Sequence, residues 1–163
     1  MKSFRFLITA VLLSSVLLLP SCGDDDTSDC STAIATGTID SKTFNFQAGR
    51  AVDVSDGVDF RLYSDDVTVT DVCSFSSSFG DDAVSIFGTL PSATVGRTEL
   101  FLLPDLSDGY TITLFDAEEF NNIIAVEGFI EVTEVTDTTI SGYLNADSGS
   151  GDSVCGTFVL MRC

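Results

Sequence analysis

The chain contains no histidine, no tryptophan and only three tyrosines among its 163 residues. Histidine is the commonest general base at neutral pH, so its absence excludes Ser-His-Asp and Cys-His catalytic groupings. The shortage of Trp and Tyr argues against a sugar-stacking platform, because aromatic faces usually make such contacts. The sequence therefore predicts a protein that is not an enzyme.

Positive charge is also scarce, since seven Lys and Arg residues face 25 Asp and Glu residues. Nucleic-acid binding requires clustered basic side chains that contact phosphates, and anionic lipid headgroups attract the same side chains. Neither partner is expected. An acidic surface instead keeps an exported protein soluble and attracts cations.

Sustained helical periodicity is missing, and apolar residues alternate with polar ones over short runs bounded by Asp, Gly and Ser. Such alternation predicts half-buried strands joined by tight turns. Phe44, Phe46 and Ala48 are expected on one face of a strand, and Phe60 and Leu62 on one face of another. About nine such strands predict an all-β domain, either a single antiparallel β-sandwich or an up-and-down barrel of calycin-like form.

The longest alternating run covers residues 122–136. Its pattern goes out of phase at Val135, which predicts a bulge or bend near Thr133. The dipeptide Asp137-Thr138 follows and is typical of a two-residue hairpin turn. Only residues 116–122 are compatible with a helical turn.

The N-terminus has the features of a signal peptide. A short positive region precedes an apolar run, Phe6–Leu19, which is shorter than the roughly 20 residues of a membrane-spanning helix. The sequence Leu19-Pro20-Ser21-Cys22 resembles a bacterial lipobox, which implies cleavage before Cys22 and lipidation of its thiol. We expect residues 1–21 to be the signal peptide. An ordinary secretory leader with a chance cysteine is the alternative.

Residues 22–31 combine the lipidated Cys22 with an acidic, polar stretch that is typical of a solvated tether. The stretch also resembles the export signal behind the lipidated cysteine of Bacteroidota-type surface lipoproteins. This resemblance implies a lipid-anchored protein of the bacterial outer membrane that faces the cell surface, with a periplasm-facing lipoprotein as the alternative. Residues 32–163 remain for a single all-β domain.

Four further cysteines, Cys30, Cys73, Cys155 and Cys163, predict two disulfides in an exported protein. A zinc site is the alternative, but the chain has no Cys-x-x-Cys pair. Cys155 and Cys163 lie in one predicted strand about 26 Å apart, too far for a disulfide. Two connectivities remain, Cys73–Cys163 with Cys30–Cys155, or Cys30–Cys163 with Cys73–Cys155.

Several motifs resemble those of a family of uncharacterised, secreted or lipid-anchored β-domains from bacterial surface lipoproteins. They are Gly37-Thr38-Ile39-Asp40, Asp71-Val72-Cys73, Glu127-Gly128-Phe129-Ile130-Glu131-Val132, Thr138-Thr139-Ile140-Ser141-Gly142-Tyr143-Leu144, and Gly156-Thr157-Phe158 with Cys163. The resemblance covers most of residues 35–163. Its mid-chain and terminal cysteines imply the pairing Cys73–Cys163, whereas Cys30 and Cys155, the remaining pair of the preferred connectivity, are additions to the family pattern. The resemblance brings no established activity.

The pattern Asp, apolar, Ser, Asp, Gly occurs twice, at residues 53–57 and 105–109. Asp and Ser bond their own backbone in turns and Gly adopts positive φ, so two hairpin turns are favoured. A pair of Ca²⁺ loops is the alternative, with Asp53, Asp56, Asp105 and Asp108 as weak candidate ligands, but the spacing does not match an EF-hand. No metal or cofactor is therefore expected.

The sequence predicts a binding or structural accessory module whose ligand is an extracellular protein or a small molecule. Two rarer functions remain as alternatives. A carboxylate-based hydrolase needs two acids about 5–9.5 Å apart across a cleft, and Asp81-Asp82 and Glu118-Glu119 are expected to be solvated instead. A lipocalin-like carrier of a small apolar ligand needs an interior cavity. Its candidate lining is Phe44, Phe46, Phe60, Phe87 and Phe129, although these residues more often fill a core.

Overall fold

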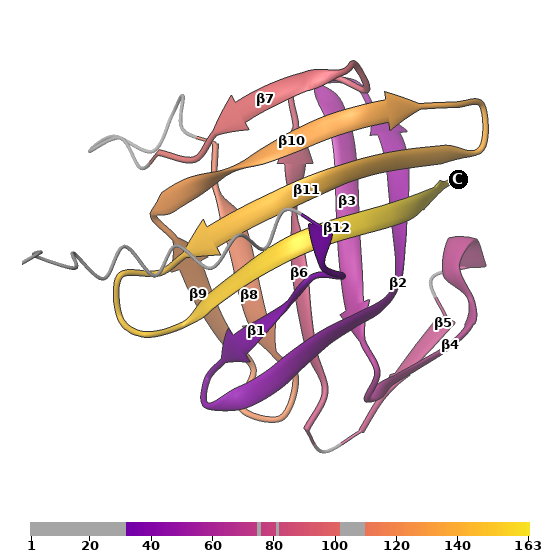
Figure 1. Ribbon diagram of the computed structural model, residues 1–163. Coiled ribbons are helices and arrows are strands. Elements are labelled where there is room, and N and C mark those ends of the chain that lie inside the picture. Colours follow the sequence, from indigo (N-terminus) through magenta and orange to yellow (C-terminus); the bar gives the residue numbers. More distant parts are fainter. Residues whose placement is uncertain (1–31, 75, 81, 102–109) are drawn as a thin grey trace, which may run out of the picture.

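The computed structural model of the chain describes residues 32–74, 76–80, 82–101 and 110–163 (Figure 1). Twelve strands and the short 3₁₀ helix η2 (Val72–Ser74) are assigned within these ranges. The strands are β1 (Thr36–Ile39), β2 (Lys42–Val54), β3 (Gly57–Ser64), β4 (Val67–Asp71), β5 (Ser76–Phe79), β6 (Val84–Leu90), β7 (Gly96–Glu99), β8 (Ile112–Asp116), β9 (Asn121–Ala125), β10 (Glu127–Val135), β11 (Thr139–Asp147) and β12 (Ser153–Arg162). The predicted all-β class is confirmed. The expected nine strands were too few because strands of four residues leave little periodicity to detect.

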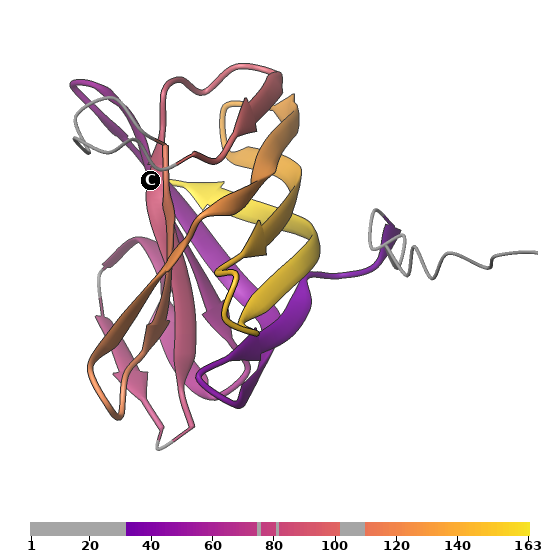
Figure 2. The same cartoon turned by 90° about the vertical axis from the view of Figure 1, so that its left-hand side faces the viewer.

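Ten of the strands form one curled sheet in the order β7-β10-β11-β12-β1-β2-β3-β6-β8-β9, and neighbours along this order are antiparallel. Strands β7, β10, β11, β12 and β1, here called the front layer, lie in front of β3, β6, β8, β9 and the C-terminal half of β2, the rear layer (Figure 1). The N-terminal half of β2 runs beside β1 in the front. Figure 2 shows the two layers from the side. Beyond the end of the short β1, β12 pairs with β2 in parallel.

The run 122–136 forms two strands rather than one, because β9 and β10 lie at different places in the sheet. The chain passes from the rear layer to the front layer at Val126, whose N–H donates to the carbonyl of Asp147 (2.8 Å). The bulge expected near Thr133 is confirmed by a register shift between Val132 and Glu134. Residues 117–120 form a turn between β8 and β9.

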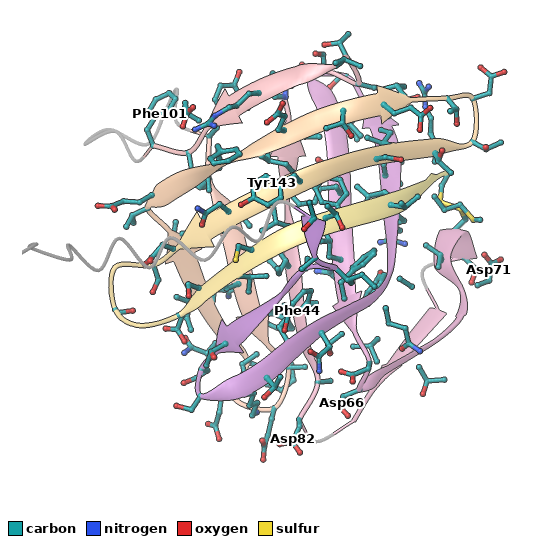
Figure 3. The ribbon with its side chains drawn as sticks, viewed as in Figure 1. Phe44, Asp66, Asp71, Asp82, Phe101 and Tyr143 are labelled. Carbon is teal, nitrogen blue, oxygen red and sulfur yellow. A yellow bond between two sulfur atoms is a disulfide. The ribbon has the colours of Figure 1, made fainter. Side chains whose placement is uncertain are left out.

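Side chains from both layers meet in one hydrophobic core between them. Phe44, labelled in Figure 3, is fully buried, and Phe158 is 2% exposed. Small residues make room for these rings. A Cβ atom on Gly142 would lie 2.6 Å from the ring of Phe158, and one on Gly49 would lie 3.1 Å from the ring of Phe46. The aromatic rings therefore occupy the space above the glycines.

A second bulge, between Phe46 and Ala48, changes which residues of β2 face the core. Phe44 and Phe46 point inward as expected, but Ala48 does not share their face, because the bulge reverses the alternation. Beyond the bulge Ala51 is buried in the core. Arg50 therefore lies on the outer face of the rear layer.

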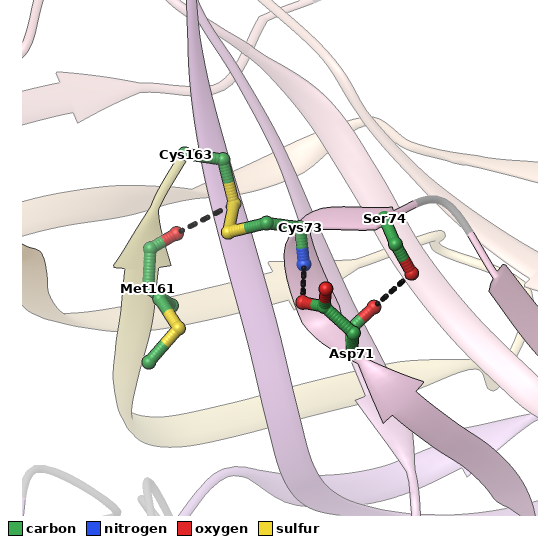
Figure 4. The surroundings of a disulfide bond; sticks show 5 residues. All are labelled: Asp71, Cys73, Ser74, Met161 and Cys163. Atoms are coloured by element: carbon green, nitrogen blue, oxygen red, sulfur yellow. Dashed lines mark hydrogen bonds between the residues drawn. A yellow bond between two sulfur atoms is a disulfide. The ribbon is translucent and has the colours of Figure 1, made fainter.

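A disulfide joins Cys73 to Cys163, whose Cα atoms are 5.4 Å apart. It connects η2 to the C-terminal end of β12 (Figure 4). The Cys73 N–H donates to Oδ1 of Asp71 (2.9 Å), and the Cys163 N–H donates to the carbonyl of Ala51 (2.9 Å). The ribbon β4–β5 is thereby fixed beside the rear layer.

Cys155 is also disulfide-bonded. Its predicted partner, Cys30, lies outside the described residues, as do the predicted signal peptide 1–21, the tether 22–31 and the lipidation site Cys22. Among the described residues, no helix has the length and apolar character needed to cross a membrane.

Candidate functional site

Three side chains lie next to one another on the outer face of the rear layer. The strand register pairs Arg50 with Arg61, and Arg61 with Phe87. Their chain neighbours Ala51 and Ile86 are buried in the core. Because successive side chains of a strand point to opposite faces, Arg50, Arg61 and Phe87 point away from the core.

These residues border a hollow of about 410 Å³ on the outer face. Small-molecule sites commonly have volumes of about 300–1,000 Å³, so the hollow is large enough for a ligand. It is open to solvent on one side. Its lining residues are Arg50, Val52, Val54, Asp59, Phe60, Arg61, Phe87, Gly88 and Thr89.

The guanidinium of Arg61 lies over the ring of Phe87, with Cζ 4.8 Å from the ring centroid. Phe87 itself packs edge-to-face against Phe115, with centroids 6.1 Å apart. A guanidinium stacked on an aromatic face keeps its N–H groups at its rim, where they can donate to an oxyanion. No ion pair of Arg61 is found within the described residues.

The cross-strand pair Arg50 and Arg61 places two like charges directly opposite each other. Such a pair is unfavourable, and it occurs in a chain with a net charge of −18. Three other cations are engaged by carboxylates: Lys42 by Asp116 and Glu118, Arg97 by Glu99, and Arg162 by Asp53. The strand register thus places two arginines side by side at the hollow of an otherwise acidic molecule.

One carboxylate belongs to the lining. Asp59 lies opposite Thr89 in the sheet, and the Thr89 hydroxyl donates to Asp59 Oδ1 (2.7 Å). Asp59 is one row of residues away from the arginine pair, at the level of Val52. The hollow thus has a positive end at the arginines and a negative group farther along.

The two arginines were not among the residues that the sequence predicted for a site. The alternation Asp59-Phe60-Arg61-Leu62 places Arg61 on the outer face. The position of Arg50 depends on the bulge in β2. The one local signal is Gly49, because an isolated glycine in a strand can mark a bulge, but it does not fix the place of the bulge. The strand pairing that brings the two side chains together is likewise not encoded in any local motif.

The candidate calcium ligands are separated. Asp53 forms an ion pair with Arg162 (2.7 Å), and Asp56 lies in the turn between β2 and β3, as the favoured hairpin interpretation predicts. Asp105 and Asp108 lie outside the described residues. Within those residues, no group of three or more His, Cys, Asp or Glu side chains is placed to hold a metal ion.

Of the described candidate acids of a hydrolase, one forms an ion pair and two are exposed to solvent. Glu118 forms an ion pair with Lys42 (2.8 Å), and Glu119 and Asp82 are exposed. Asp81 lies outside the described residues. Among the described residues, the lining of the hollow on the rear layer contains one carboxylate, that of Asp59.

Lys42 links Glu118 to a buried carboxylate, since its Nζ lies 2.7 Å from Oδ1 of Asp116. The Asp116 side chain is 1% exposed. Burial raises the pKa of its carboxyl group, but hydrogen bonds from Lys42 and from the backbone of Glu118 and Glu119 outweigh this and hold the pKa below its ordinary value. Hydrogen bonds to Asp116 and Glu118 raise the pKa of Lys42. This ion pair joins the start of β2 to the end of β8.

The five phenylalanines proposed as the lining of an apolar cavity do not share one surface. Phe44 and Phe60 are buried in the core, and Phe46 packs against it. Phe87 lies on the outer face of the rear layer beneath Arg61. Phe129 lies on the outer face of the front layer.

The surroundings of Phe129 form a second, smaller aromatic group. Cζ of Arg97 lies 3.3 Å from the Phe129 ring centroid. The ring of Tyr143, labelled in Figure 3, is 5.3 Å away between centroids. Arg97 is held by Glu99, and the hydrogen bond between them raises the pKa of Arg97. This arginine, unlike Arg61, has an acidic partner among the described residues.

The fold and the hollow define an all-β domain with a charged and apolar surface site. A comparison with known proteins finds no matching family model, no matching curated protein and no matching solved structure.

Proposed function

We propose that this chain is an exported, lipid-anchored outer-membrane protein whose β-domain binds an extracellular ligand without transforming it. The observation that carries the proposal is the hollow on the rear layer, which combines two arginines with apolar walls. The lipobox-like sequence ending at Cys22 supports export and anchorage.

Binding without turnover agrees with the chemistry of the lining. The chain has no histidine to act as a general base. The described lining of the hollow has one carboxylate, Asp59, where a glycosidase-type hydrolase needs two. Arginine and phenylalanine, in contrast, are residues that supply much of the binding energy at recognition sites.

The anchor is tested by expressing the full chain and a C22S variant in a bacterium that processes lipoproteins. The wild-type chain should incorporate labelled palmitate and sediment with membranes, and the variant should remain unlabelled. A C73S variant, which removes a different cysteine, should still be labelled. Labelling that survives C22S would refute the anchor.

The binding face is tested by a small-molecule fragment screen on the chain from residue 22, with Cys22→Ser to leave it unlipidated. In ¹H–¹⁵N NMR spectra, binding fragments should shift the amides of Arg61, Phe87 and Thr89. Shifts confined to Arg97 and Phe129 on the front layer would place the binding site elsewhere and overturn this part of the proposal.

A further inference from the structure

We infer that an uncharged, largely apolar strip on the outer face of the front layer rests against the lipid bilayer when Cys22 is lipidated. The strip consists of Ile34, Thr157, Val159 and Met161. The inference rests on the proposed function, because it says which surface of the anchored protein contacts the membrane. It is carried by the exposure of these side chains close to the N-terminal end of the described domain.

Three residues of the strip belong to β12. Thr157, Val159 and Met161 alternate with Phe158 and Leu160, which are buried in the core. Because successive side chains of a strand point to opposite faces, the three residues point away from the core. They form a row along the outer face of the front layer.

Ile34 extends this row onto the N-terminal segment. It pairs with Thr157 in a parallel bridge, and its chain neighbour Ala35 is fully buried. Ile34 is 66% exposed, Val159 55% and Met161 51%. More than half of the surface of each apolar side chain of the strip is therefore in contact with water.

The strip and the adjoining strand carry no charge. The residues of β11 that lie opposite β12 here are Thr139, Ser141 and Tyr143. A surface of this kind can leave water without burying an ion, and it occurs in a chain with 25 Asp and Glu residues. Because the chain as a whole is acidic, a membrane of neutral headgroups suits the contact better than an anionic one.

The short connection to Cys22 brings the strip to the membrane. Eleven residues lie between Cys22 and Ile34, so the strip is at most about 43 Å from the lipidated cysteine. Residues 23–33 contain no large apolar side chain and so have nothing with which to cover the strip. The bilayer offers apolar surface at this range, and covering the strip with it is favourable.

The test uses the absence of tryptophan from the chain, which lets one introduced Trp report on its own surroundings. Lipidated full-length V159W is reconstituted in phosphatidylcholine vesicles with and without brominated acyl chains, which quench an indole that contacts them. The Trp should be quenched by the brominated lipid and should emit at a shorter wavelength than in the unlipidated Cys22→Ser protein. V54W replaces another exposed valine, on the outer face of the rear layer, and should keep its emission.

Two charged substitutions provide a matched comparison in the V159W protein. M161E places a carboxylate beside the probe and should reduce the quenching, because a charged side chain resists transfer into a bilayer. V54E adds the same charge on the rear layer and should leave the quenching unchanged. Circular dichroism verifies that each variant is folded, and palmitate labelling verifies that it is lipidated.

The outcomes separate this inference from the proposed function. If the chain incorporates no palmitate, the anchor is refuted and the inference falls with it. If the chain is lipidated but V159W is quenched no more than V54W, the strip does not contact the bilayer and the anchor remains. If the unlipidated chain forms a dimer in analytical ultracentrifugation that M161E dissociates, a second copy covers the strip and the inference is overturned.

Discussion

Phe158 and Phe120 lie in opposite environments, and comparing them shows how much the burial of one side chain contributes to the free energy of unfolding. Phe158 is 2% exposed and Phe120 is 80% exposed. Phe158→Ala should lower the free energy of unfolding by about 3–5 kcal/mol, because it removes a ring from a packed core. Phe120→Ala removes the same atoms from the surface and should change it by less than about 0.5 kcal/mol. Urea denaturation of both variants measures the difference, and equal effects would contradict the packing described for Phe158.

The ion pair of Lys42 with Asp116 gives a second prediction at the residue scale. Lys42→Met leaves the buried Asp116 carboxylate without its ammonium partner, so the variant should be less stable than wild type at pH 7. The lowered pKa of Asp116 in wild type means that its stabilising effect is present above the unfolded pKa of about 3.9 and is lost as the pH falls through the folded value.

The stability gap between wild type and Lys42→Met should therefore narrow as the pH is lowered through the acid range. Denaturation curves at a series of pH values measure this gap. Arg162→Met is a control, because it removes a cation whose partner, Asp53, is half exposed, and its effect should be small at every pH. A gap for Lys42→Met that stays constant with pH would show that the carboxylate does not matter.

At the scale of the element, the backbone of the two-residue turn between β1 and β2 is strained, because neither of its residues is glycine. Asp40 and Ser41 both have positive φ, 50° and 66°, as a type I′ turn requires, and glycine is favoured at such positions. Ser41→Gly should raise the free energy of unfolding by about 0.5–1 kcal/mol. Ser55→Gly, in the turn between β2 and β3, should not stabilise, because Ser55 is not at positive φ. Thermal unfolding compares the two.

The disulfide is a constraint on a whole element, since it fixes the β4–β5 ribbon. It closes a loop across a sequence separation of 90. The double variant C73S/C163S should lose about 2–5 kcal/mol of unfolding free energy. Limited proteolysis under native conditions should then cut first within residues 65–82, because η2 is no longer tied to the end of β12. An intact ribbon in the double variant would show that its contacts with Tyr63 suffice.

Strand positions were largely predictable from the sequence, and the faces of one strand were not. The alternation around Phe60 and Leu62 predicted core positions that are confirmed, because both lie in a regular strand. Ala48 was assigned to the wrong face, since the bulge in β2 follows from how this strand matches β3, which no local pattern reveals. The position of Arg50, and with it the hollow, was hidden for the same reason.

On the scale of the whole molecule, the net charge of −18 makes the folded chain repel itself. Added sodium chloride screens this repulsion, so the melting temperature should rise between low salt and about 0.5 M salt. Differential scanning calorimetry measures the change. A melting temperature that falls with salt would mean that local ion pairs such as Lys42 with Asp116 outweigh the net repulsion.

The overall arrangement was predictable only as a class. Alternation and turn residues predict an all-β domain, but they do not give the order in which ten strands join or the crossing from rear to front layer at Val126. These depend on contacts between strands far apart in the sequence, such as β1 with β12. The pairing Cys73–Cys163, a long-range contact implied by the resemblance, is present in the structure.

The described N-terminal segment lies against the front layer, where Ala35 donates to the carbonyl of Thr157 (2.9 Å) and Thr157 donates to that of Ala33 (2.7 Å). The hollow lies on the outer face of the rear layer, and Figure 2 shows the rear and front layers on opposite sides of the molecule. Nine residues lie between Cys22 and Thr32, so these two residues are at most about 35 Å apart. In the proposed anchored protein this short tether keeps the front layer nearer the bilayer. The hollow then faces away from the membrane, toward solutes in the surrounding medium.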